Sequence, residues 1–155
     1  MKFKLDRNSS HLAGEYFVPA ELYRRGFSVA MTLGNAKAID LFTEQGTRTV
    51  NVQVKTIQHK KSVGWTVTRR QIRPNIIYIF VCLNIPDGSP EYYICTAKEA
   101  RKMVREYKTR SIVNLSKFKG AENSRDFNGQ WKKVRAAREP VASKTASRKR
   151  GGLRR

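Results

Sequence analysis

The chain has 155 residues, the usual size of one domain, and its hydrophobic content of 39% is enough for a packed core, which excludes a wholly disordered protein. Its 32 Lys and Arg residues stand against 12 Asp and Glu, and the resulting formal net charge of +20 indicates a polyanionic partner, with nucleic acid favoured over an anionic membrane surface. No apolar run reaches the roughly 18 residues of a membrane span, and the N-terminus has no hydrophobic signal segment, so we expect no membrane association and a cytoplasmic protein, nucleoid-associated in a bacterium or archaeon.

The first third of the chain predicts one helix followed by three strands. The helix is expected over residues 9–25, with a serine cap at its start, and Pro19 is expected to bend it or end it early. Three β-like runs separated by turn signals follow, at residues 27–33, 38–43 and 48–57.

The remainder predicts a strand pair, a second helix and a short last strand. These are expected at residues 76–83, 91–95, 97–109 and 111–115, with an extra short strand near residues 65–68. Thr96 and Glu99 have the spacing of a capping box for the second helix. Residues 138–155 predict a disordered basic tail, so we expect one domain over residues 1–137 with an α/β fold, a mixed α+β sheet.

The run at residues 48–57 is the most informative strand. Three valines alternate with Asn51, Gln53 and Lys55, which places the polar side chains on one face. Asp40 is the one carboxylate in the neighbouring apolar run, and a hairpin between the two runs brings it beside Gln53 and Lys55. A carboxylate, an amide oxygen and an ammonium on one face suit a Mg²⁺ and water-activating site; a surface hairpin with an Asp–Lys contact is the alternative.

Four segments of the sequence resemble the PD-(D/E)xK nuclease superfamily, in particular its small Holliday-junction-resolvase-like and homing-endonuclease-like branch. They are Gly14-Glu15, the run from Ala20 to Phe27, Ala38-Ile39-Asp40-Leu41 and Val52-Gln53-Val54-Lys55-Thr56, and the resemblance covers roughly residues 9–134. It implies a restriction-endonuclease-like core of α-β-β-β-α-β order, in which helices flank a central mixed sheet.

The resemblance also implies roles for individual residues. Asp40 matches the first motif carboxylate, a metal ligand, after Ile39 in place of the usual small residue or proline. Gln53 stands where the family most often has Asp or Glu, Lys55 matches the motif lysine, and Glu15 matches an accessory carboxylate. The implied catalytic residues are therefore Glu15, Asp40, Gln53 and Lys55, with Mg²⁺ or Mn²⁺ held by Asp40, Gln53 and Glu15.

The implied function is a metal-dependent DNA endonuclease that hydrolyses phosphodiester bonds, with branched or structured DNA as a candidate substrate. Because an amide oxygen carries no charge, the alternative is a nuclease-like fold that binds nucleic acid, DNA or RNA, with weak or no cleavage. Cutting two strands favours a homodimer.

Clustered bases are the candidate phosphate contacts. Residues 140–155 hold six basic groups and no acid, and the rest of the chain keeps 26 bases against 12 acids, a charge of +14. The predicted nucleic-acid-binding residues are Lys37, Lys60, Lys61, Arg69, Arg70 and Arg73, and Lys144, Arg148, Lys149 and Arg150 in the tail. For Trp65, core packing competes with base stacking, and for His59 a surface position competes with a general base.

Overall fold

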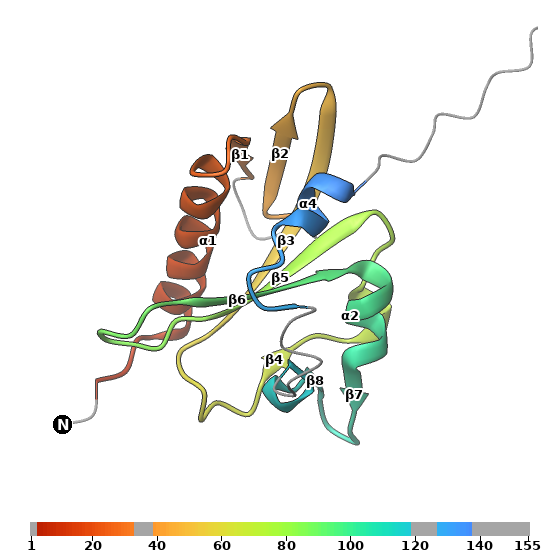
Figure 1. The fold of residues 1–155 in the computed structure, drawn as a ribbon. Helices are drawn as coiled ribbons and strands as arrows, with labels where there is room; N and C mark the ends of the chain where they lie inside the picture. The colour runs from red at the N-terminus through yellow and green to blue at the C-terminus, as the bar shows by residue number, and fades with distance from the viewer. Residues whose placement is uncertain (1–2, 33–38, 119–126, 138–155) are drawn as a thin grey trace, which may run out of the picture.

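The computed structural model describes residues 3–32, 39–118 and 127–137 (Figure 1). The tail predicted at residues 138–155 lies outside this part of the chain. The elements in chain order are α1 (Arg7–Tyr23), β1 (Ser28–Met31), β2 (Leu41–Gln45), β3 (Arg48–Ile57), β4 (Trp65–Thr66), the 3-10 helix η1 (Arg69–Gln71), β5 (Ile76–Cys82), β6 (Glu91–Thr96), α2 (Ala97–Met103), β7 (Val104–Glu106), β8 (Ser111–Val113), the 3-10 helix η2 (Leu115–Phe118) and α4 (Lys132–Ala136).

A five-stranded mixed sheet of order β1-β2-β3-β5-β6 forms the centre of the molecule. β3 and β5 pair in parallel and the other neighbours are antiparallel. A smaller sheet of order β4-β8-β7 lies beside it. The predicted series of a helix, three strands, a strand pair and a helix is confirmed, as is the mixed sheet flanked by helices. One detail of the α-β-β-β-α-β order differs: the crossover from β3 to β5 contains β4 and η1, and the second helix follows β6.

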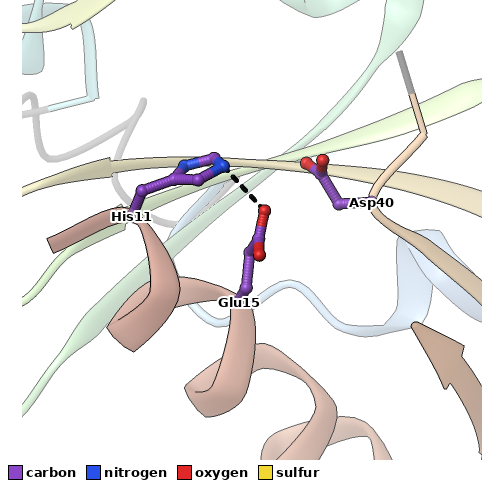
Figure 2. A group of neighbouring side chains, drawn as sticks. All are labelled: His11, Glu15 and Asp40. Carbon is purple, nitrogen blue, oxygen red and sulfur yellow. Dashed lines mark ion pairs between the residues drawn. The ribbon is translucent and has the colours of Figure 1, made fainter. Parts of the chain in front are cut away.

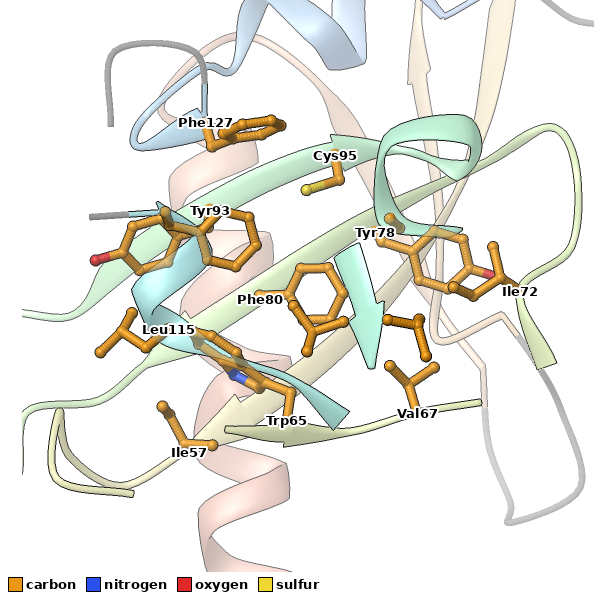
Figure 3. Packing of buried hydrophobic residues seen from close by; sticks show 14 of the residues in the cluster. Ile57, Trp65, Val67, Ile72, Tyr78, Phe80, Tyr93, Cys95, Leu115 and Phe127 are labelled. Carbon is orange, nitrogen blue, oxygen red and sulfur yellow. The ribbon is translucent and has the colours of Figure 1, made fainter. Parts of the chain in front are cut away.

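The central sheet is buried on both faces, which divides the core into two clusters. On one face, Val18 and Leu22 of α1 and Val134 of α4 pack against the valines of β3 and the odd-numbered residues of β5. On the other face, Ala100 of α2 and side chains from the small sheet cover Tyr78 and Phe80 (Figure 3). The three valines that alternate along β3 therefore all point into the first cluster, as the sequence pattern predicts.

Trp65 belongs to the second cluster and is fully buried. Its ring lies 5.4 Å from that of Phe80 and 5.8 Å from that of Phe118, and its indole N–H donates to the Val81 carbonyl at 3.0 Å. The core interpretation of Trp65 is confirmed, and stacking on a base is excluded.

The first helix differs from its prediction at both ends and at Pro19. It begins at Arg7, because the Asp6 carboxylate accepts the Ser9 backbone N–H at 2.9 Å and caps the first turn. It continues through Pro19 to Tyr23, so the expected early end is wrong. An internal proline costs about 3 kcal/mol, whereas burying Val18 and Leu22 contributes about 1.5–3 kcal/mol each.

Tertiary pairing also shortens the second helix. The expected helix over residues 97–109 ends at Met103, and the chain turns into β7, which pairs with β8. Val104 lies opposite Val113 in that ladder and both are buried, which favours a strand at this point over another helical turn. No helix among the described residues is long and apolar enough to cross a bilayer.

Candidate active site

The candidate site lies along β3, beyond the point where β2 stops pairing with it. The β2–β3 register runs from Gln45–Arg48 to Leu41–Val52, and Asp40 directly precedes β2 at this end of the ladder. The Asp40 backbone N–H donates to the Val52 carbonyl at 3.0 Å, which is one residue out of step with the ladder, since Val52 already lies opposite Leu41. The predicted hairpin is confirmed, although Asp40 precedes the strand instead of lying within it.

The Asp40 carboxylate is fixed at the free edge of β3. Its Oδ2 accepts the Val54 backbone N–H at 2.7 Å, which holds the group between the positions of Gln53 and Lys55. Burial raises the pKa of Asp40, against the lowering effects of the Val54 hydrogen bond and of the nearby His11 and Lys55. The cost of burying the ionised carboxylate therefore exceeds the stabilisation that these three groups give it.

A close helix-to-strand contact brings α1 to the same edge. Gly14 faces Thr56 of β3, and a Cβ built at Gly14 would overlap the Thr56 hydroxyl oxygen and lie 3.1 Å from both Thr56 Cβ and Cγ2. Only glycine permits this approach without a shift of the helix. The next residue, Glu15, and His11 one turn earlier are thereby directed toward Asp40 (Figure 2).

His11, Glu15 and Asp40 form a potential metal-binding cluster. The His11 Nε2 lies 2.7 Å from Glu15 Oε1, and one ligand atom from each of the three residues lies within 4.8 Å of the other two. Carboxylate oxygens suit Mg²⁺ and Mn²⁺, and an imidazole nitrogen also suits transition metals. These donors fit a divalent cation.

The electrostatics of Glu15 support the same conclusion. Burial raises the pKa of Glu15; His11 and Lys55 lower it, and Asp40 raises it further. Burial and the neighbouring Asp40 carboxylate thus disfavour the ionised form of Glu15, and a bound cation would relieve this repulsion. Lys55 acts on both carboxyls, which places its charge beside them.

The structure brings three of the four predicted catalytic residues into electrostatic contact: Glu15, Asp40 and Lys55. Gln53 is half-buried on β3 and directly precedes Val54, whose backbone N–H donates to the Asp40 carboxylate. Sequence reasoning misses His11. The available signal is its position four residues before Glu15, which puts both side chains on one face of a helix.

A cleft of about 1020 Å³ opens beside this cluster. His11 of the metal-binding cluster lines it, and so does Lys55, whose charge lies beside the two carboxyls. The remaining lining comes from residues 4–10, around the start of α1, and from residues 56–66, at the end of β3 and beyond it, including His59. His59 therefore lies in the cleft wall rather than on an open surface.

The predicted phosphate-binding residues that are described lie outside this cleft. Lys60 pairs with Glu91 at 2.9 Å, and Arg69 pairs with Glu106 at 3.6 Å and donates to the Val104 carbonyl at 2.9 Å. Lys61, Arg70 and Arg73 are exposed. Lys37 and the tail residues Lys144, Arg148, Lys149 and Arg150 fall outside the described residues.

Comparison with solved structures identifies a similar fold. A bacterial homing endonuclease, I-Ssp6803I, matches with a TM-score of 0.58 and 15% sequence identity over 86% of this chain and 96% of that chain. No family model matches the sequence, and no curated protein matches it. The likeness confirms the restriction-endonuclease-like fold expected from the sequence.

Proposed function

We propose that this protein is a metal-dependent DNA endonuclease whose catalytic residues are Glu15, Asp40, Gln53 and Lys55. One observation carries the proposal. Two partly buried carboxylates, one from α1 and one from the residue before β2, converge beside a lysine of β3 within a fold like that of a homing endonuclease. Partly buried carboxyls whose pKa values are raised, next to a charged partner, are typical of functional sites.

Asp40 and Glu15, with the amide oxygen of Gln53, would hold Mg²⁺ or Mn²⁺. Such an ion supplies Lewis acidity and lowers the pKa of a bound water. Lys55 stabilises negative charge that develops on the phosphate under attack. His11, paired with Glu15 at 2.7 Å, keeps that carboxylate turned toward Asp40.

DNA is the proposed partner because the charge far exceeds what solubility requires. The chain carries +20 overall and +14 without residues 140–155. Exposed bases at Lys61, Arg70 and Arg73 are available to phosphates outside the cleft. Branched or structured DNA is the proposed substrate.

A second function, nucleic-acid binding without cleavage, follows from one specific feature. Gln53 offers an uncharged ligand where a carboxylate would bind a divalent cation more strongly. A chain with this substitution keeps the fold and the basic surface even if its metal affinity is too low for turnover.

One experiment separates the two functions. The full-length protein is incubated with a four-way junction and with linear duplex DNA, in Mg²⁺, in Mn²⁺ and in EDTA. An endonuclease produces metal-dependent nicks that EDTA abolishes. Retarded but intact DNA under every condition supports the binding module and contradicts the nuclease.

A further inference from the structure

The segment that precedes α1 is fastened to the end of β3 by a single glutamine side chain. Gln58 accepts the Leu5 backbone N–H at 3.1 Å through Oε1 and donates to the Leu5 carbonyl at 2.7 Å through Nε2. Chain ends are usually poorly ordered unless they are tied down in this way. The two bonds fix residues 4–7 as one wall of the cleft beside the carboxylate cluster.

This wall presents positive charge that the protein leaves uncompensated. Lys4 and Arg7 line the cleft together with Lys55, and neither Lys4 nor Arg7 forms an ion pair with any described residue. Both are exposed. Two cations held near a third and open to solvent form a surface suited to a polyanion.

Asp6, the one acid among the residues that line the cleft, offsets one of the three positive charges of Lys4, Arg7 and Lys55 and leaves two in excess. The Asp6 carboxylate accepts the backbone N–H of Ser9 at 2.9 Å and the Ser9 hydroxyl at 2.5 Å. Those bonds, led by that to the hydroxyl, lower the pKa of Asp6 and direct its oxygens into the first turn of α1. Asp6 acts as a helix cap, and the rest of the cleft wall stays basic or neutral.

We propose that this cleft binds the sugar-phosphate backbone of the nucleic acid, with Lys4 and Arg7 contacting phosphates and Gln58 as the residue that positions them. The proposal rests on the proposed function, because the cleft shares His11 and Lys55 with the candidate catalytic site. A backbone lying in it passes directly alongside the carboxylates. The segment before α1 thus becomes part of the substrate-binding surface.

The test compares charge removal in the cleft with matched charge removal elsewhere. The full-length Lys4→Gln/Arg7→Gln protein is measured against Lys102→Gln/Lys108→Gln, which removes two exposed bases that do not line the cleft. Affinity for a labelled four-way junction is followed by fluorescence anisotropy in EDTA over a series of salt concentrations. Loss of two phosphate contacts lowers the salt slope by about 1.8, which corresponds to roughly 30-fold in affinity near 0.15 M salt.

The expected result is that loss for the cleft variant and only a few-fold loss for the control. Equal losses in both variants overturn the proposal. Gln58→Met supplies a separate arm, since it removes both hydrogen bonds to Leu5 without changing charge. It is expected to weaken binding several-fold and to speed proteolysis between residues 3 and 7; faster proteolysis with unchanged affinity contradicts the positioning role.

Failure of the nuclease proposal is distinguishable. If the wild-type protein never cuts DNA but its binding depends on Lys4 and Arg7, the nuclease proposal is refuted and the proposal that the cleft binds DNA stands. If the wild-type protein cuts DNA and the two double variants lose equal DNA affinity, the nuclease proposal stands and the proposal that the cleft binds DNA is refuted.

Discussion

Gly14→Ala tests whether the close contact between α1 and β3 positions the proposed catalytic carboxylates. Helix propensity alone favours the change by about 1 kcal/mol. The structure opposes it, because the new methyl group would overlap the Thr56 hydroxyl and lie 3.1 Å from Thr56 Cβ and Cγ2, so the two elements must shift even if the hydroxyl rotates away. Overpacking of this kind costs about 1–3 kcal/mol. After the gain in helix propensity is subtracted, we expect a net loss of about 1 kcal/mol in the free energy of unfolding.

The helix must move outward by a distance on the order of 1 Å to restore ordinary carbon contacts of about 3.5–4 Å. Glu15 moves with it, away from Asp40. A misplacement of that size costs on the order of 100-fold in rate. Urea denaturation and a DNA-nicking assay in Mn²⁺ measure the two effects on the same variant.

Thr56→Ala supplies the compensating change. The Thr56 hydroxyl is buried without a hydrogen-bond partner in the described part of the chain, so its removal relieves a desolvated group while opening space for the methyl. We expect Gly14→Ala/Thr56→Ala to regain most of the stability and rate, with a coupling energy of about 2 kcal/mol. A Gly14→Ala protein as stable and as active as the wild type would refute the claim that the contact of Gly14 with Thr56 sets the position of α1.

Further consequences concern metal affinity, pH and the tail. Gln53→Glu adds charge at a proposed ligand and should shift the metal titration of cleavage to lower Mn²⁺ concentration; an unchanged midpoint places Gln53 away from the ion. Folding raises the pKa of Asp40 from its ordinary 3.8, so this residue lowers the stability of the folded protein as the pH rises from about 4 through the pKa of the folded state. Asp40→Asn should therefore gain stability relative to the wild type between acid and neutral pH, measured by thermal denaturation in EDTA. An Asn variant whose relative stability is independent of pH contradicts this. Deletion of residues 140–155 removes six of 32 bases and should reduce the salt slope of DNA binding by about two to four, while low-salt binding persists; an unchanged slope assigns the tail no phosphate contacts.

Local patterns in the sequence predict the part of the site that lies on two neighbouring strands. The alternation in β3 fixes which face Gln53 and Lys55 occupy, and a tight hairpin brings Asp40 to this strand, where its carboxylate accepts the Val54 N–H. Both signals span fewer than about 20 residues, the range over which period and turn chemistry determine register. The fold class followed from the same series of elements.

The remaining features depend on contacts between distant segments. β7 forms because Val104 meets Val113, which overrides a helical pattern that local spacing favours. The cleft wall depends on Gln58 reaching Leu5, 53 residues away, and no periodicity encodes such a pair. His11 is the exception, since its spacing from Glu15 is visible in the sequence once a helix is assigned there.

The most direct test of the central claim is the DNA-nicking rate of Asp40→Asn in Mg²⁺ or Mn²⁺, beside Asp87→Asn as a control with the same charge change at an exposed turn. Asparagine keeps an oxygen to accept the Val54 N–H, so the fold is preserved while the central carboxylate is lost. The account predicts metal-dependent nicking by the wild type and Asp87→Asn, loss of nicking in Asp40→Asn by a factor of at least about 100, and DNA affinity in EDTA within a few-fold for all three. Wild-type nicking by Asp40→Asn would contradict the assignment of this site.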